Sequence, residues 1–490
     1  MIGRGRIAAL LCGAAALVGT PAQADTLREA LVKAYETNPT LQAARSQQRA
    51  EDENVPIQRA QGLPNISSTT RYTEFPKVSP NSFTAPQRVL QIGQTLTVPV
   101  YSGGGVKNSV KAAKERVSAG QASLRGTESS VFSQVVAAYM DVLRTQALVG
   151  LSANQVDVLT INLEATSDRF EIGDLTRTDV AQSESRLAVA RSDLRSAQAN
   201  LIQARETYIQ LVGDAPNDLM PPPPLPNLPD SPYTAVDTAL EHNPDLIAAR
   251  EQAEAAGYDV KAAGAGRLPT VGLFANSNYT NYFNTLGGPI AQNFRQVEKT
   301  ANAGVQITIP LFQGGAPAAR QRQAQARESA ALEQIIAAER NVIAQVRASY
   351  SSYQASLEII ESSQTAVSAA ELSLEGVRAE NSIGNRSILD VLNAEQELVQ
   401  AQAQLVTARR NAYVAGFSLL AAMGKAEARD LGLEGGTLYD PMDNYRRVRG
   451  KLLDWDRDPQ PVAKSTRTVD IPPASAEIPG DVTAAETPQP

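Results

Sequence analysis

The fold is decided by residues 180–211, VAQSESRLAVARSDLRSAQANLIQARETYIQL, and by a near copy at residues 391–422, VLNAEQELVQAQAQLVTARRNAYVAGFSLLAA. In each stretch one set of residues recurs every seven positions: Val180, Leu187, Leu194, Leu201 and Tyr208, then Val391, Leu398, Leu405, Ala412 and Leu419. The offset positions are smaller: Ser183, Ala190, Ala197, Ala204 and Leu211, then Ala394, Ala401, Ala408, Ala415 and Ala422. This heptad pattern predicts helices that pack unusually closely in a left-handed coiled coil.

A glycine turn precedes each heptad stretch. The sequence reads FEIGD at residues 170–174 and NSIGN at residues 381–385, after long helix-forming runs rich in Ala, Gln, Ser, Glu and Val. Glycine accommodates the left-handed backbone that ends a helix, so each turn is expected to send the chain back antiparallel. We therefore predict two long helical hairpins, with Gly173, Asp174, Gly384 and Asn385 at their tips.

Composition favours an extended molecule that is exported from the cytoplasm. The chain has 490 residues and only 5% aromatic residues, too few for one large globular interior. Residues 1–24 resemble a signal peptide that ends in an A-x-A site at Ala24, and the only cysteine, Cys12, lies within it. No later segment reaches the roughly 20 apolar residues of a membrane-spanning helix. The net charge of −7 gives no reason to expect nucleic acid as a partner.

The sequence contains an internal repeat. Asn38-Pro39 recurs as Asn243-Pro244, 205 residues later, and Gly173 recurs as Gly384, 211 residues later. The predicted organisation is repeat 1 at residues 25–213, a proline-rich linker at 214–233, repeat 2 at 234–432, and a largely disordered C-terminal tail at 433–490. The displacement grows by six residues, from 205 to 211, and these six residues fall between the strands of the second copy. The helical rods of the two copies are therefore expected to have equal lengths.

Each repeat also contains two stretches that alternate between apolar and small polar residues. The alternation predicts strands at about residues 65–75, 89–101, 270–282 and 301–312. Aromatic residues gather at the ends of these strands that are expected to lie farthest from the helices, where they would form the aromatic girdle of a membrane interface. They are Tyr72, Phe75, Tyr279, Tyr282 and Phe283.

Four strands cannot cross a membrane alone, because hydrocarbon leaves the sheet edges with unpaired backbone groups. Three chains would supply a closed barrel of twelve strands, whereas two would give only a filled eight-stranded barrel. The sequence therefore predicts a mainly α fold with a small β part, assembled as a homotrimer. We expect no catalytic residues, cofactor or metal, since the only histidine, His242, has no evident partners. The alternative is a periplasmic coiled-coil adaptor or scaffold with no membrane-spanning barrel.

These features together resemble the TolC family of outer-membrane efflux and type I secretion proteins. The resemblance is carried by the twofold repeat, the Asn-Pro pairs, the Leu-Pro pairs before the strands, and the run IGNRSILDVLNAE at residues 383–395. It implies a β-barrel in the outer membrane lipid of a Gram-negative cell that continues into a periplasmic helical tunnel. It also implies a passive exit duct whose hairpin tips contact a periplasmic adaptor and an inner-membrane transporter.

Two aspartates are candidates for a periplasmic gate. Asp179 and Asp390 each follow a tip glycine by six residues. In a trimer each would form a ring of three carboxylates, whose mutual repulsion raises the pKa of the group and which attracts cations. The simpler interpretation is that each aspartate only favours the first turn of its helix through the helix dipole.

The resemblance implies that Asp390 forms the constriction, with Thr178 and Asp179 on the neighbouring hairpin. Arg386 lies four residues before Asp390 and is expected to hold the closed state through ion pairs. Asn381 and Asn393 depart from the family pattern, in which an aromatic gate residue and a second acidic ring can occur.

Overall fold

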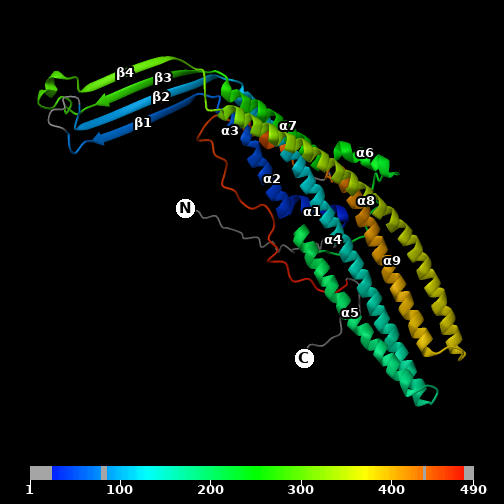
Figure 1. Ribbon diagram of the computed structural model, residues 1–490. Coiled ribbons are helices and arrows are strands. Elements are labelled where there is room, and N and C mark those ends of the chain that lie inside the picture. Colours follow the sequence, from blue (N-terminus) through cyan, green and yellow to red (C-terminus); the bar gives the residue numbers. More distant parts are fainter. Residues whose placement is uncertain (1–24, 79–84, 434–437, 479–490) are drawn as a thin grey trace, which may run out of the picture.

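The molecule is a bent rod of helices from which one sheet extends (Figure 1). The computed structural model describes residues 25–78, 85–433 and 438–478, so the predicted signal peptide lies outside the described residues. The predicted class, mainly helical with a small antiparallel sheet, is confirmed. No helix in the described part of the chain combines the length and the apolar character needed to cross a membrane.

Two long hairpins form the rod. Helix α4 (Gly105–Glu171) returns as α5 (Arg177–Val212), and α8 (Ala316–Ser382) returns as α9 (Ile388–Ala422). The outgoing helices α4 and α8 each have 67 residues, which at 1.5 Å per residue is roughly 100 Å. Several heptad residues, among them Leu187, Leu201 and Tyr208, are buried against the outgoing helix.

Short helices continue the rod beyond the ends of α5 and α9 (Figure 1). In the first repeat they are α1 (Leu27–Thr37), α2 (Pro39–Asp52) and α3 (Asn54–Ala60); in the second they are α6 (Pro232–His242), α7 (Pro244–Gly264) and the single turn η1 (Ala265–Arg267). Helices α1 to α3 pack against α4, and α7 packs between α4 and α8. The two repeats are therefore joined along the upper half of the rod.

The Asn-Pro pairs fasten these short helices to the hairpins. The side-chain oxygen of Asn243 accepts the backbone N–H groups of Asp245 and Leu246, which caps α7. Its amide nitrogen donates to the carbonyl oxygen of Ala422 at the end of α9, at 2.8 Å. Asn38 repeats this arrangement at the start of α2, where its amide donates to Leu211 of α5 at 2.9 Å. One buried side-chain amide thus binds backbone N–H groups at the start of one helix and a backbone carbonyl at the end of another.

The main core lies where the short helices, the hairpins and the linker meet. The hydroxyl oxygen of Tyr139 on α4 lies 2.6 Å from the carbonyl oxygen of Met220 in the linker and 2.9 Å from that of Asp25. Burial raises the pKa of Tyr139, so this phenol stays protonated and can donate. The largest side chains of the core are fully buried and come from several helices: Leu41, Phe132, Tyr139, Tyr208 and Phe417.

The sheet is antiparallel with the order β1-β2-β3-β4. Its strands are β1 (Asn65–Glu74), β2 (Arg88–Ser102), β3 (Thr270–Asn281) and β4 (Val297–Thr308), and η2 (Gly288–Asn293) lies between the last two. The sequence predicts the fourth strand at 301–312, but it begins and ends earlier. Pro310 has no N–H to donate to a ladder, whereas Val297, Glu298 and Lys299 pair with the far end of β3.

The C-terminal tail, which the sequence predicts to be largely disordered, contains one helix among its described residues. Residues Pro441–Val448 form α10, which Asp440 caps by accepting the N–H of Met442 at 2.8 Å. Tyr445 packs against the cluster around Val55 and Val117. With eight residues, α10 is too short to show a clear helical period in the sequence. The chain beyond it follows the rod as far as α5, where the N–H of Ala474 donates to Glu206 at 2.8 Å.

We predict that Asn243→Ala lowers the free energy of unfolding of the detergent-solubilised protein by about 2 to 4 kcal/mol, because a cap is lost and a buried carbonyl is left unpaired. Asn243→Ser keeps an acceptor for the cap but loses the donor to Ala422, so its loss should be smaller. Unfolding followed by circular dichroism measures both. Asn154→Ala, at an exposed position of α4, is the control; an equal loss there would contradict the prediction.

Candidate functional site: the hairpin tips and the sheet

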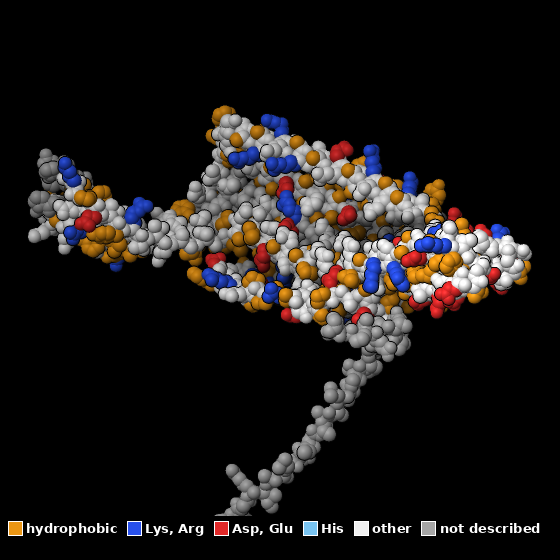
Figure 2. Space-filling view, turned by 90° about the horizontal axis from the view of Figure 1, so that it is seen from below, with side chains coloured by type: hydrophobic (Ala, Val, Ile, Leu, Met, Phe, Trp, Pro, Cys, Tyr) orange, Lys and Arg blue, Asp and Glu red, His pale blue; other side chains and the backbone are white. Residues whose placement is uncertain are grey.

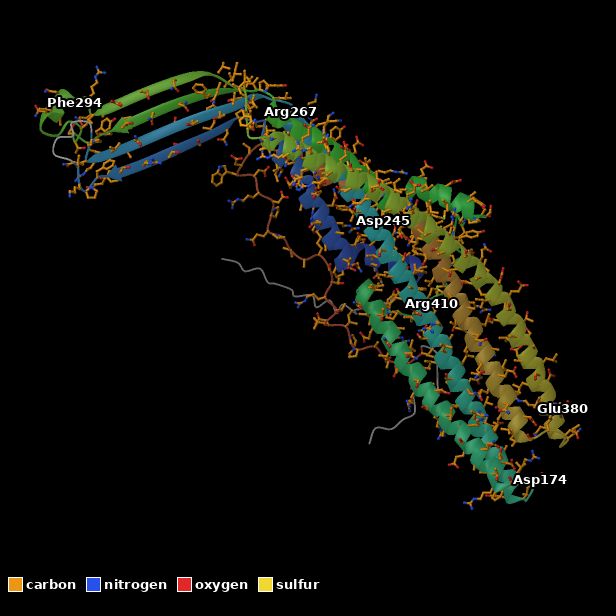
Figure 3. All side chains as sticks on the ribbon, viewed as in Figure 1. Asp174, Asp245, Arg267, Phe294, Glu380 and Arg410 are labelled. Carbon is orange, nitrogen blue, oxygen red and sulfur yellow. The ribbon has the colours of Figure 1, made fainter. Side chains whose placement is uncertain are left out.

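Each hairpin tip is closed by a glycine in the left-handed region. Gly173 has φ +87° and Gly384 has φ +80°. The next residue continues the turn: Asp174 N–H donates to Arg169 and Asn385 N–H donates to Glu380, each at 2.9 Å. Figure 3 labels Asp174 and Glu380 at the ends of the two hairpins. The four predicted tip residues therefore lie in equivalent turns.

Asp179 and Asp390 form capping boxes at the starts of α5 and α9. An oxygen of Asp390 accepts the N–H of Ser387 at 3.0 Å and its hydroxyl at 2.8 Å, while the N–H of Asp390 donates back to Ser387. Asp179 makes the same contacts with Thr176. These hydrogen bonds lower the pKa of each aspartate below its ordinary value of 3.8. Within one chain, each carboxylate thus has a local structural role.

Arg386 is held within its own tip. Its Nε donates to an oxygen of Glu380 at 2.7 Å, and this contact raises the pKa of the guanidinium. Its carbonyl oxygen accepts the side-chain amide of Asn381 at 2.8 Å. Thr178 is exposed on the first turn of α5. Hence Arg386, Asp390 and Asn381 come together in one turn, whereas Thr178 and Asp179 lie on the other hairpin.

Contacts between the two hairpins lie further up the rod, and the sequence did not single them out. Glu395 of α9 is only 3% exposed; Asn162 of α4 donates to both of its oxygens, at 2.9 and 3.0 Å. Arg378 of α8 forms an ion pair with the same carboxylate at 3.0 Å. We call Asn162, Arg378 and Glu395 the clasp. A charged residue directly after the heptad alanine Ala394 was the available signal.

A second link supports the clasp on the other side of α9. Arg186 of α5 donates to the side-chain oxygens of Asn393 at 2.9 Å and of Gln396 at 2.5 Å. Asn393, which departs from the family pattern, therefore has a partner on the other hairpin. Leu159, Leu187 and Leu392 pack together beneath these polar contacts.

The sheet has one apolar face and one polar face. Residues directly opposite one another on neighbouring strands point to the same side, and the register places Ile66, Leu96 and Ala275 in one such row. The apolar face comprises Ile66, Ile92, Leu96, Val98, Leu273, Ala303, Val305 and Ile307. The opposite face comprises Thr69, Thr95, Thr97, Asn276, Asn278, Thr300 and Asn302. The apolar face also carries Ser68, Gln94 and Ser277, but its large apolar side chains remain partly or fully exposed, as is typical of a surface that contacts another molecule or lipid.

The predicted aromatic residues lie at the end of the sheet farthest from the rod. Tyr72 and Tyr279 belong to the apolar face, and the rings of Tyr72 and Phe283 meet edge to face with centroids 6.1 Å apart. Phe75 is exposed beyond β1, and the hydroxyl of Tyr282 lies 3.4 Å from Glu298. Exposed Phe294, labelled in Figure 3, joins this group, which the sequence did not predict. Figure 2 shows hydrophobic side chains gathered there.

One acidic cluster lies away from these regions. Among the described residues, Glu115, Glu251 and Glu254 bring carboxylate oxygens within 4.8 Å of one another between α4 and α7. Burial first, and then the neighbouring glutamates, raise the pKa of Glu115. Partly exposed acidic groups of this kind are common without an ion, so we assign no metal site to them.

Comparison with known proteins agrees with this geometry. A family model described as "Outer membrane efflux protein" matches residues 30–214 and 235–425. Outer membrane efflux protein BepC of Brucella suis biovar 1 (strain 1330) is 33% identical over 444 residues, covering 91% of this chain and 95% of that protein. Outer membrane protein TolC of Escherichia coli (strain K12) is 25% identical over 430 residues, 86% of each chain.

A solved structure shows the same fold. The CmeC outer membrane channel of Campylobacter jejuni superposes with a TM-score of 0.72 at 16% identity, covering 86% of this chain and 89% of that one. The predicted role as an outer-membrane exit duct, for efflux or type I secretion and with a periplasmic extension, is confirmed by the family match and the relatives. The chain belongs to the outer membrane efflux protein family.

Proposed function

We propose that three copies of the chain form one channel, with a twelve-stranded barrel in the outer membrane and a helical tunnel on the same axis. The observation that carries this proposal is the sheet, in which β1 and β4 each have only one neighbour in the described chain. An unpaired backbone group in hydrocarbon costs several kcal/mol. Pairing β1 of one copy with β4 of the next removes every open edge.

The two faces of the sheet assign the inside and the outside of this barrel. The apolar face would contact lipid, and the row of threonines and asparagines would line the water-filled interior. The side-chain amide of Asn276 donates to Asn302 at 3.1 Å on that polar face. A periplasmic adaptor without a membrane-spanning sheet, the alternative that the sequence left open, would have no use for such an apolar face.

The tips would narrow the tunnel and meet the other components of the machine. We place the constriction at the rings of Asp390 and Asp179 carboxylates, next to Arg386 and Thr178. Ile172 and Ile383 are exposed at equivalent places beside the tip glycines and offer apolar contacts to a periplasmic adaptor. The duct itself would be passive, with energy supplied by an inner-membrane transporter.

The clasp would hold the two hairpins together in the closed state. Opening requires the α8–α9 hairpin to move relative to α4 and α5, which breaks the contacts from Asn162 and Arg186. Contacts within a tip, such as the Ser387 capping box, would survive this movement. In this proposal the clasp determines how easily the hairpins separate, and the aspartates at the tips determine the charge of the constriction.

The first test is the number of subunits. We expect native mass spectrometry of the protein in detergent to give three chains per particle and imaging to show a lumen along the axis. Proline substitutions in the edge strand β4, Thr300→Pro with Asn302→Pro, remove backbone N–H groups from that edge and should produce monomers. A wild-type monomer, or a solid bundle, would rule out the proposed channel.

For the constriction, Asp390→Asn should increase single-channel conductance and weaken block by multivalent cations, because it removes three charges per trimer. Ser387→Ala keeps the charge and should retain the block. Asp237→Asn, on the exposed side of α6, is the matched charge control. Unchanged currents and unchanged block in Asp390→Asn would remove this residue from the gate.

The pH dependence of cation block tests the state of Asp390. Its hydrogen bonds with Ser387 lower the pKa of the carboxylate, so the charge is present above that pKa and lost below it. We therefore expect block to persist as the pH falls through 3.8 and to vanish only at lower pH. If repulsion within the ring determined the pKa, block would already vanish above this value.

For the clasp, Glu395→Gln should weaken the contact between the hairpins by about 1.5 to 3 kcal/mol, the usual value for hydrogen bonds to a charged group. The closed state then becomes less populated, and cells should leak small antibiotics inward. Glu397→Gln, at an exposed position of the same helix, is the control. Equal leakage in the two variants would contradict a specific role for Glu395.

A further inference from the structure

The segment that follows α10 is folded into a stapled loop. Residues 449–458, which we call the Trp455 loop, are closed by Arg447, whose two terminal nitrogens each lie 2.7 Å from an oxygen of Asp458. Lys451 forms ion pairs with Asp456 at 3.1 Å and with Asp458 at 3.5 Å. Arg447 lowers the pKa of Asp458 to about 2, so the staple remains charged at neutral pH.

The staple turns apolar side chains outward. The N–H of Asp456 donates to the carbonyl of Leu453 at 3.1 Å, which makes a tight turn at the end of the loop. Leu452, Leu453 and Trp455 are 62%, 79% and 86% exposed. Trp455 is also the only tryptophan of the chain. Arg447, Lys451 and Asp458 thus form the base of the loop, and its exposed part carries Leu452, Leu453 and Trp455 together with the charged Asp454 and Arg457. Three large apolar side chains exposed side by side are unusual on a surface that contacts only water.

The loop lies where the rod meets the sheet. Nη1 of Arg59, in the last turn of α3, donates to the carbonyl of Arg449 at 3.0 Å, and β1 begins only six residues later at Asn65. The side chain of Asn444 anchors α10 to Asp52 of α2 at 2.7 Å. In Figure 1 the orange-red trace beyond α10 approaches the base of β1 before it returns along the rod.

The apolar surface of the sheet begins at the same level. Tyr101, at the rod end of β2, is half exposed and pairs with Val271, and Val271 pairs with exposed Ile307. These residues belong to the face that contacts lipid, so the boundary of the membrane lies close to them. The Trp455 loop is held near this level through Arg59, six residues before the start of β1.

We infer that the Trp455 loop is a membrane anchor, in which Leu452, Leu453 and Trp455 enter the headgroup region of the periplasmic leaflet of the outer membrane. Tryptophan prefers the membrane interface, where its ring is partly buried and its N–H remains wet. The charged staple would stay at the headgroup level. The inference rests on the sheet spanning the outer membrane, and it assigns a function to the tail that lies outside the channel.

Because Trp455 is the only tryptophan, tryptophan fluorescence of the full mature protein, excited where its tyrosines do not absorb, reports on this loop alone. The trimer is reconstituted into vesicles of phosphatidylethanolamine and phosphatidylglycerol, with or without bromine on the acyl chains. We expect a blue-shifted emission relative to the unfolded protein, quenching by the brominated lipids, and protection from the aqueous quencher acrylamide.

Variants separate the anchor from general effects. The double substitution Leu452→Ser and Leu453→Ser should abolish lipid quenching and restore quenching by acrylamide. The control is Val462→Ser with Val469→Ser, at exposed apolar positions farther along the tail, which should leave both signals unchanged.

Two results would overturn the anchor. One is a water-exposed Trp455 that acrylamide quenches fully; the other is a Trp455 shielded from both acrylamide and brominated lipid, which would mean that protein covers it. Conductance measured in the same vesicles separates this failure from that of the channel. Conducting trimers without lipid quenching reject only the anchor, whereas the absence of channels rejects the proposed function.

Discussion

Every backbone N–H and C=O inside hydrocarbon needs a partner, and the rest of this structure depends on that constraint. A chain that contributes four strands in the order β1-β2-β3-β4 satisfies it everywhere except at its two outer strands. The sheet can therefore enter a membrane only as part of a closed ring. Because each sheet is joined to two long hairpins, closure of the strands in the proposed trimer would also bring the helices around one axis.

The Asn-Pro pair, which occurs once in each repeat, both caps a helix and anchors the end of a neighbouring helix. Asn38 and Asn243 each cap one helix and hold the end of another, so the short helices continue the hairpins without a break in the rod. Toward the tips this buried anchoring is replaced by polar contacts around Glu395 and by exposed turns. Buried packing around Tyr139 thus gives way to exposed turns at the tips, the end that moves in the proposed opening.

The sequence predicted the repeated features well because their causes are local. Heptads, tip glycines and alternating strands each depend on residues within a few positions, and the 211-residue repeat shows each feature twice. It missed the clasp, because Asn162 and Glu395 are 233 residues apart and no local pattern tells which helices face each other. From the sequence, Asp390 was interpreted as a gate residue, and its capping box with Ser387, three residues before it, was not identified. The sequence also missed α10, which is held by contacts with α2 rather than by its own period.

The pairing of β2 with β3 has a consequence for biogenesis. These strands form the centre of the sheet, yet the first ends at Ser102 and the second begins at Thr270, with the complete α4–α5 hairpin between them. Only β1 with β2, and β3 with β4, can associate as soon as they leave the translocation machinery. The centre of the sheet can pair only when the residues between β2 and β3 allow its halves to meet, so folding of the rod and completion of the sheet are linked.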